Sequence, residues 1–367
     1  MNNFIKPLLL ILRSIKKNID YKITCTILIF PILSSCELVE TSTGLTGQYN
    51  PPPAAVTIYK IYSINEDGGG LKLLSLGSNA SFSFDGSKIY YWSTNSTVYS
   101  IDLNGQSEQQ ILTPNTIDYS VSEDGHKIVF SSGNYPNAPN IYTENSDGTN
   151  IKKLTNVSGK YDMDLEPDFS LDASQIVFRQ VSSIAVMASD GSDRRVILPS
   201  SAQHYYQLPK FSPSGNIIYV YDDSLDTYLQ MYNQVNHQVN TLFSFSSFDT
   251  PISPGDGEFE ISYKTNKVLV VSHLNGNGIS SFLYQINLDN LQVEKLIEGY
   301  DAFYSLDGNE ISYMLEGDTT NSINVYNLST QQVKAIHINL PGNEIHHPKL
   351  SLEGGLLIFE ADSVAKQ

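Results

Sequence analysis

The sequence predicts an all-β fold: a seven-bladed β-propeller closed by pairing N-terminal outer strands with the C-terminal inner hairpin. The first observation is a recurring phrase, Phe-Ser-x-Asp-Gly followed by a short run of Ile or Val with an aromatic residue. The second is its spacing. The serines stand at positions 83, 122, 170, 212, 262, 305 and 351, which gives steps of 39, 48, 42, 50, 43 and 46 residues. A repeat of this period built from short β runs is typical of propeller blades.

Each copy of the phrase predicts an inner antiparallel hairpin. An Asp-Gly or Ser-Gly pair in the phrase can adopt the positive φ of a tight turn at little steric cost. The β-branched and aromatic run that follows suits a strand buried on both faces. The copy at 261–269 lacks Asp-Gly, so we expect an irregular blade there. In order, the copies span residues 82–91, 121–130, 169–178, 211–219, 261–269, 304–313 and 350–359.

A second hairpin follows each of the first six copies. The first of them runs through Val98–Leu103, turns at Asn104-Gly105 and returns to Ile111. Apolar and polar residues partly alternate in these segments, as expected of half-exposed outer strands. The other five outer hairpins span residues 141–155, 184–198, 231–242, 284–296 and 323–336.

The two ends of the chain supply what the remaining blade lacks. The last copy ends at Phe359 and has no outer hairpin after it. The first copy is preceded by an extra hairpin, Ile58–Tyr62 with Leu71–Leu74. Together they would complete one four-stranded blade, which would close the ring and remove two exposed sheet edges.

Several of these residues resemble the TolB-like (WD40-like) propeller repeat, Pro-x-Phe/Trp-Ser-Pro-Asp-Gly with a later Ile-Tyr, Asp-Gly and Leu-Thr. The best local matches are Pro209–Gly215, Glu166–Ser170, and Ile141-Tyr142 with Leu154-Thr155. The resemblance covers about residues 55 to 362 and implies the propeller fold. It does not imply one function, because such propellers serve as scaffolds, enzyme domains and ligand binders. We expect no counterpart of the smaller domain that precedes the TolB propeller, because the segment ahead of Ile58 is short.

The N-terminal segment predicts a bacterial lipoprotein. Basic residues precede a short apolar run, Ile23–Ile32, and then Leu33-Ser34-Ser35-Cys36, which resembles a lipobox. We therefore expect residues 1–35 to be a signal peptide, 36–54 a lipid-anchored flexible tether and 55–367 the propeller. Cys36 would carry the lipid and hold the protein at the cell envelope, on the periplasmic or cell-surface face of the outer membrane. The alternative is an uncleaved membrane anchor.

Composition restricts the partners. The chain holds 22 basic and 39 acidic residues, a formal charge of −17, and cleavage before Cys36 would leave 17 and 38, a charge of −21. Phosphate backbones repel such a surface, so we expect no nucleic-acid partner. Cys36 would then be the only cysteine, so no internal disulfide is expected. We expect a monomer whose membrane contact is the N-terminal lipid alone.

One sequence register predicts a binding site at a mouth of the central channel. Counting four residues back from each repeat serine gives Asn79, Asp118, Glu166, Leu208, Glu258, Asp301 and His347. Five of these positions hold a carboxylate or an imidazole: Asp118, Glu166, Glu258, Asp301 and His347. They could cap backbone N–H groups, as buried polar groups usually do, or bind a cation or a basic chain end. We expect no cofactor, apart from a divalent cation that this mouth could hold.

No hydrolase elbow, phosphate loop or helical zinc motif is present, so we expect no catalytic residues. The sequence therefore favours a non-enzymatic scaffold that binds an envelope protein or a basic peptide segment. The alternative is a carbohydrate-active enzyme or binder resembling the oligogalacturonate lyase family, with a metal near the channel axis. For it, His346-His347 is the only His pair, and only His347 falls in the inner register. Tyr205-Tyr206, expected in a loop, is the best candidate for an exposed aromatic platform.

Overall fold

The computed structural model describes residues 57–94, 97–112, 115–133, 138–159, 162–201, 204–223, 226–245, 259–274, 280–318, 321–351 and 355–364. All of them belong to one compact unit, Ala55–Gln367. They form 27 strands and no α-helix. Accordingly, this part of the chain holds no helix that could cross a membrane. The expected signal peptide, tether and Cys36 lie outside the described residues, so those boundaries stay predictions.

Five four-stranded antiparallel sheets make up most of this unit. The first two contain β6 (Thr116–Val121), β7 (Lys127–Ser132), β8 (Asn140–Asn145) and β9 (Lys152–Lys153), then β10 (Asp164–Phe169), β11 (Gln175–Gln180), β12 (Ser183–Ala188) and β13 (Arg195–Leu198). The next two contain β14 (Tyr205–Phe211), β15 (Ile217–Asp222), β16 (Thr227–Tyr232) and β17 (Val239–Ser244), then β18 (Phe259–Ser262), β19 (Lys267–Leu274), β20 (Ser280–Asn287) and β21 (Val293–Glu298). The fifth contains β22 (Tyr300–Tyr304), β23 (Glu310–Met314), β24 (Ser322–Asn327) and β25 (Gln332–His337).

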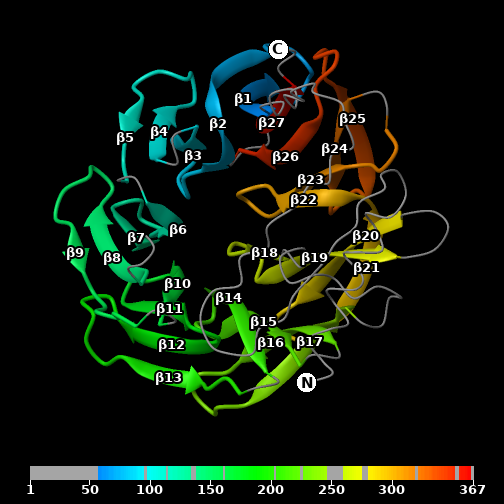
Figure 1. Cartoon of the computed structure of the whole chain (residues 1–367). Helices are drawn as coiled ribbons and strands as arrows, with labels where there is room; N and C mark the ends of the chain where they lie inside the picture. Colours follow the sequence, from blue (N-terminus) through cyan, green and yellow to red (C-terminus); the bar gives the residue numbers. More distant parts are fainter. Residues whose placement is uncertain are drawn as a thin grey trace, which may run out of the picture. The chain divides into compact units, whose positions relative to one another are not determined.

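A sixth, seven-stranded sheet has the order β26-β27-β1-β2-β3-β4-β5. Its strands are β26 (Ile345–Leu350), β27 (Leu356–Val364), β1 (Thr57–Asn65), β2 (Lys72–Phe82), β3 (Lys88–Ser93), β4 (Val98–Asp102) and β5 (Gln109–Gln110). Figure 1 shows the sheets following one another in chain order around a central space, with β6, β10, β14, β18, β22 and β26 innermost. The all-β prediction is thus confirmed, with the repeated antiparallel sheets that a propeller requires.

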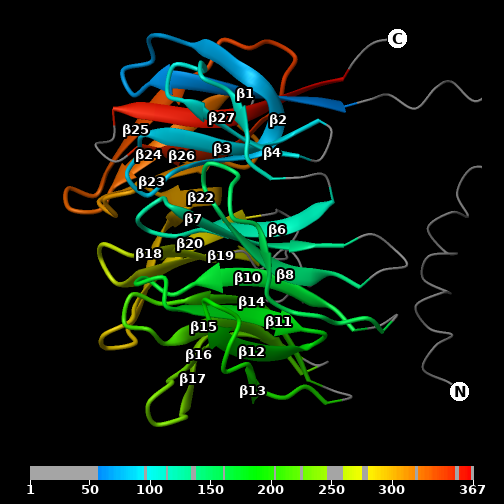
Figure 2. The ribbon, with the colours of Figure 1, turned by 90° about the vertical axis from the view of Figure 1, so that its left-hand side faces the viewer.

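The expected junction of the two chain ends is confirmed. β1 pairs antiparallel with β27 along nine residue pairs, from Thr57 with Val364 to Asn65 with Leu356. The two strands lie side by side in Figure 2. β27 is also paired with β26, so the C-terminal hairpin has no free edge on the β1 side.

The extra N-terminal hairpin and the first inner strand differ from the prediction in one respect. They share a single eleven-residue strand, β2, which pairs with β1 through residues 72–76 and with β3 through residues 77–82. The change of partner occurs at Gly77. A Cβ atom there would lie 2.2 Å from the Trp92 carbonyl oxygen, so only glycine fits this close approach.

The repeated Ser and Asp build the loop between the two inner strands. In the copy at 170, the Ser170 hydroxyl donates to Asp172 Oδ1 at 2.7 Å and accepts from the Gln175 amide at 3.0 Å. Asp172 Oδ1 also accepts from the Ser174 amide. The copies at 83, 122 and 305 repeat the same bonds. The serine and the aspartate recur because they cap this loop.

Hydrophobic clusters join consecutive sheets, and seven of them lie within the described residues. One, with Ile61 and Ile358 against Ile89 and Tyr91, joins the β27–β1 part of the seven-stranded sheet to its β2–β4 part. The sheet β18–β21 is four-stranded. Residues 246–258 and 275–279 of the same segment lie outside the described residues, so the irregular blade expected there stays a prediction. Asn266, at φ 54°, adopts the left-handed conformation in its turn in place of glycine.

Candidate functional site

The innermost strands enclose a central channel with a cavity of about 940 Å³. All described members of the predicted register line it: Asn79, Asp118, Glu166, Leu208, Asp301 and His347. Glu258 lies outside the described residues. Five of the six have a positive φ, between 48° and 54°, and Asp118 does not. At these positions the pairing register shifts, so each marks a β-bulge that turns a side chain toward the axis.

A second register, two residues before each repeat serine, also faces the channel. Its members are Ser81, Ser120, Asp168, Lys210, Glu260, Phe303 and Lys349. Our sequence reasoning missed them. Side chains of a strand alternate between its two faces with a period of two. Counting two residues back from each repeat serine, in addition to four, would therefore have found them. Their lysines make the lining mixed in charge rather than purely acidic.

Three of the predicted acids form hydrogen bonds between neighbouring sheets. Asp118 Oδ2 accepts from the Glu166 amide at 3.2 Å, and Glu166 Oε2 accepts from the Leu208 amide at 2.7 Å. Asp301 Oδ2 accepts from the His347 amide at 2.6 Å. In each case the carboxylate of one sheet holds the amide at the same register position of the next sheet. These bonds match the capping interpretation.

An arginine pairs with one of these carboxylates, and burial raises the pKa of two carboxyl groups in the lining. Arg179 contacts Glu166 Oε1 from Nε at 2.8 Å and from Nη2 at 2.7 Å. Burial raises the pKa of Asp118, and the nearby Glu166 charge adds to this, against the hydrogen bond from the Glu166 amide. Burial likewise raises the pKa of Asp168, whose oxygens accept from the Ser120 hydroxyl and the Phe211 amide.

His347 sits between two carboxylates. Its Nδ1 lies 3.3 Å from Glu360 Oε1, and its Nε2 lies 3.8 Å from Asp301 Oδ1. Glu360 is 1% exposed and accepts from the Ala80 amide of β2. Burial alone would lower the pKa of His347, but the two carboxylates outweigh it and raise the pKa. Glu360 was not predicted, because it lies on β27 in no repeated register.

Loops between the two inner strands of different sheets contact one another across the channel. Phe84, in the β2–β3 loop, contacts Tyr263 of the β18–β19 loop edge to face, with ring centroids 5.4 Å apart. In the same region, Lys264 Nζ lies 3.7 Å from Glu123 Oε1 in the β6–β7 loop. Neither pair belongs to neighbouring sheets, so these contacts bridge the channel. The cavity is thus narrowed at the loop end, and the predicted register lies away from that end.

The expected aromatic platform is placed differently. Tyr205 and Tyr206 belong to strand β14 and not to a loop, because their β-forming side chains continue the pairing with β15. Tyr206 packs on Tyr219 and Tyr221, with centroids 5.6 and 5.3 Å apart. Only Tyr205, at 44% exposure, presents a largely free face. The loop prediction was therefore wrong for both residues.

Comparison with known proteins supports the fold. No protein-family model matches the chain, and no curated protein does. Among solved structures, it is similar to an oligogalacturonate lyase in complex with manganese, with TM-score 0.61 and 11% identity, covering 85% of this chain and 98% of that one. An oligogalacturonate lyase from Vibrio parahaemolyticus gives 0.56 and 13%, covering 74% and 84%. TolB from Acinetobacter baumannii gives 0.48 and 15%, covering 80% and 66%.

The two lyase structures are propellers, so the fold and the channel together define the class: this chain is a β-propeller protein with a charged central channel. At such low identity the likeness concerns the fold and not the activity. Within the described lining there are five carboxylates, Asp118, Glu166, Asp168, Glu260 and Asp301, against two lysines, Lys210 and Lys349. A channel with this excess of acid attracts cationic groups.

Proposed function

We propose that this chain is a non-enzymatic cell-envelope lipoprotein whose propeller is a protein–protein interaction scaffold. Its channel mouth receives a basic peptide segment of an envelope partner. The observation that carries the proposal is the channel itself: a cavity of about 940 Å³ whose described charged lining has more carboxylates than lysines. An excess of carboxylates in a cleft raises the local concentration of cationic ligands.

The arrangement of the acids favours binding over chemistry. Asp118, Glu166 and Asp301 are held by backbone amides of the next sheet, so they form a fixed wall of acceptors. A preorganised wall costs little ordering entropy when a flexible chain end binds. Asp301 Oδ1 and the second-register Glu260 lie on the same lining and add charge to it. The net charge of −17 acts in the same direction at longer range.

We further propose that the propeller has seven blades. The seven-stranded sheet forms two of them, divided at β2, because β2 changes partner at Gly77 and a hydrophobic cluster lies between the two parts. Cys36 carries the lipid and residues 36–54 form the tether; both lie outside the described residues. The protein is a monomer at the bacterial envelope, with no nucleic-acid partner.

The test removes charge and keeps the hydrogen bonds from the next sheet, and it gives up the ion pair between Glu166 and Arg179. In the double variant Glu166→Gln and Asp301→Asn, an amide oxygen can still accept from the Leu208 and His347 amides. The probe is a fluorescent, unstructured peptide of alternating lysine and glycine, with a glutamate–glycine peptide as its control. We expect the wild-type chain to bind the lysine peptide in a salt-sensitive manner, and the double variant to bind it at least about tenfold more weakly.

The matched control is Glu294→Gln together with Glu298→Gln on strand β21, which removes two charges away from the channel lining. If both double variants lose binding equally, the general charge binds the peptide and the channel does not. If the channel variant folds and binds like wild type, the mouth is not the site. Unfolding of the channel variant would assign these acids a purely structural role, and the proposal would then fail.

A second candidate function is a carbohydrate-active enzyme or binder. The fold likeness to an oligogalacturonate lyase in complex with manganese is the observation in its favour. In this chain, His347, Asp301 and Glu360 would bind a metal ion at the channel, and Lys349 would bind the carboxylate of an acidic sugar. Incubating the protein with manganese and oligogalacturonate tests it. An unsaturated product detected by ultraviolet absorbance, and lost in His347→Ala, would favour this candidate over the scaffold.

A further inference from the structure

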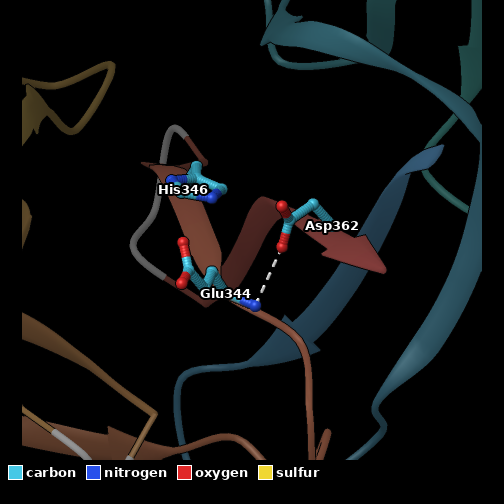
Figure 3. A group of neighbouring side chains, drawn as sticks. All are labelled: Glu344, His346 and Asp362. Atoms are coloured by element: carbon cyan, nitrogen blue, oxygen red, sulfur yellow. Dashed lines mark hydrogen bonds between the residues drawn. The ribbon is translucent and has the colours of Figure 1, made fainter. Parts of the chain in front are cut away.

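Three metal-ligating side chains meet outside the channel, at the junction of the two chain ends. Glu344 directly precedes β26, His346 lies on β26 and Asp362 lies on β27. One ligand atom of each residue lies within 4.8 Å of the others. Figure 3 shows the three side chains facing a common space beside the β26–β27 hairpin. None of them lines the channel cavity described above.

Strand pairing explains why these residues meet. Ile345 pairs with Ala361, so Glu344 lies opposite Asp362 and shares a face of the sheet with it. The Glu344 amide donates to Asp362 Oδ1 at 3.0 Å, and the Asp362 amide donates to the Glu344 carbonyl at 3.1 Å. His346 is two residues further along β26, which returns its side chain to the same face. Asp362 also pairs with Tyr59 of β1, so its backbone is held from both sides.

The bonding of the side chains leaves the ligand atoms available. Within the described residues, neither the Glu344 carboxylate nor the His346 ring has a hydrogen-bond partner. The Asp362 carboxylate is oriented by the Glu344 amide through one oxygen only. An outer hydrogen bond of this kind fixes a ligating carboxylate in metal sites. His346 and Asp362 are half-buried, and Glu344 is exposed, so an ion could reach the site from solvent.

The ligand set selects the kind of ion. Calcium and magnesium prefer oxygen ligands alone and in larger number, whereas an imidazole with carboxylates suits zinc and neighbouring transition metals. Three protein ligands with one position left for water is a common zinc arrangement. Ligand atoms about 2.1 Å from a tetrahedral ion lie about 3.4 Å apart. The three side chains would need to close by about an ångström, which rotamer adjustment of the exposed Glu344 allows.

We propose that Glu344, His346 and Asp362 bind one divalent transition-metal ion, for which Zn²⁺ is the best-fitting probe. The ion would link β26 and β27, the two strands of the last hairpin, and β27 pairs with the first strand, β1. An ion that binds only the folded chain stabilises it by mass action. Metal binding would therefore strengthen the junction on which ring closure depends. It requires neither the channel nor its partner.

The test titrates chelator-treated, full-length protein with Zn²⁺ by isothermal calorimetry and follows its melting temperature. We expect one equivalent to bind and the melting temperature to rise. His346→Ala and Glu344→Gln should each weaken binding at least about tenfold, because each removes one of three ligands. Neither side chain has a hydrogen-bond partner in the described part, so both variants should fold and melt like wild type without metal.

Two controls keep the outcome decisive. His347→Ala removes the adjacent imidazole of the channel and should leave this Zn²⁺ binding unchanged. His237→Ala removes an imidazole that bonds to Tyr232 elsewhere on the ring and should also leave it unchanged. Absence of stoichiometric binding in wild type overturns the proposal. So does unchanged affinity in His346→Ala, or a loss seen only in His347→Ala, which would move the ion to the channel.

Discussion

The buried carboxyl of Glu144 should make the stability of the propeller depend on pH. It lies on β8, is 3% exposed, and its Oε1 has no hydrogen-bond partner within the described residues. Burial, with a smaller contribution from the charge of Asp147, raises the pKa of Glu144 from 4.5 to about 7. The folded protein therefore keeps a proton on this carboxyl that the unfolded chain has already released.

The sign of the pH effect follows from this difference. Below about pH 4.5 both states are protonated and stability is unaffected. Between about pH 4.5 and 7 the unfolded state loses its proton first, so the free energy of unfolding falls as pH rises, and the loss is complete above about pH 7. Raising the pKa of Glu144 from 4.5 to about 7 corresponds to about 3 kcal/mol in total. Between about pH 5 and pH 8 it amounts to about 2.5 kcal/mol.

Replacing Glu144 by Gln removes this titration and keeps the shape of the side chain. Relative to wild type, Glu144→Gln should gain about 2.5 kcal/mol in free energy of unfolding when pH rises from about 5 to about 8. Chemical denaturation of both proteins at the two pH values measures it. Glu294→Gln, at an exposed position on β21, is the control and should show no such pH-dependent difference. An equal stability difference at both pH values for Glu144→Gln would refute the reasoning.

Three further predictions concern the ring, its loops and its anchor. A chain that starts near residue 78 lacks β1, so it should aggregate or melt far below wild type in gel filtration and thermal scans; a monomer with normal melting would contradict closure. Ser122→Ala leaves the Lys127 amide without its acceptor, and should cost about 1–3 kcal/mol in denaturation, whereas an unchanged midpoint would deny the loop-capping role. Cys36→Ala should release the protein from membranes in cell fractionation; continued membrane association would favour the uncleaved anchor.

The repeat made the fold predictable because it reports backbone requirements that every blade shares. The glycine of Asp85-Gly86 has φ 69°, as the turn chemistry required, and the serines of the first six copies are buried as loop caps. These requirements depend on neighbours within about five residues, so they are visible in sequence. The continuity of β2 was not, because a single strand that serves two partners depends on the distant Trp92 carbonyl.

The channel was predictable only in part for a similar reason. The register that contains Asp118, Glu166 and Asp301 follows from the repeat, and the structure brings its described members to one cavity. What each carboxylate contacts depends on the adjacent sheet, some 42 to 48 residues away, which no local pattern reports. Glu360 and Arg179 were missed because they belong to neither channel register.

The two proposed sites differ in how evolution of the repeat could produce them. The channel acids stand at equivalent positions in successive copies, and each bonds the amide of the next copy, so duplicating a copy duplicates both the acid and its partner. The group Glu344, His346 and Asp362 arises once, where the last hairpin meets the first strand, and no copy elsewhere repeats that junction within the described residues. The carboxylate–amide bonds between neighbouring sheets therefore follow from repetition, and a single metal site follows from the one place where repetition stops. Zn²⁺ binding should accordingly respond to changes at the β1–β27 junction, and peptide binding to changes in the repeated register.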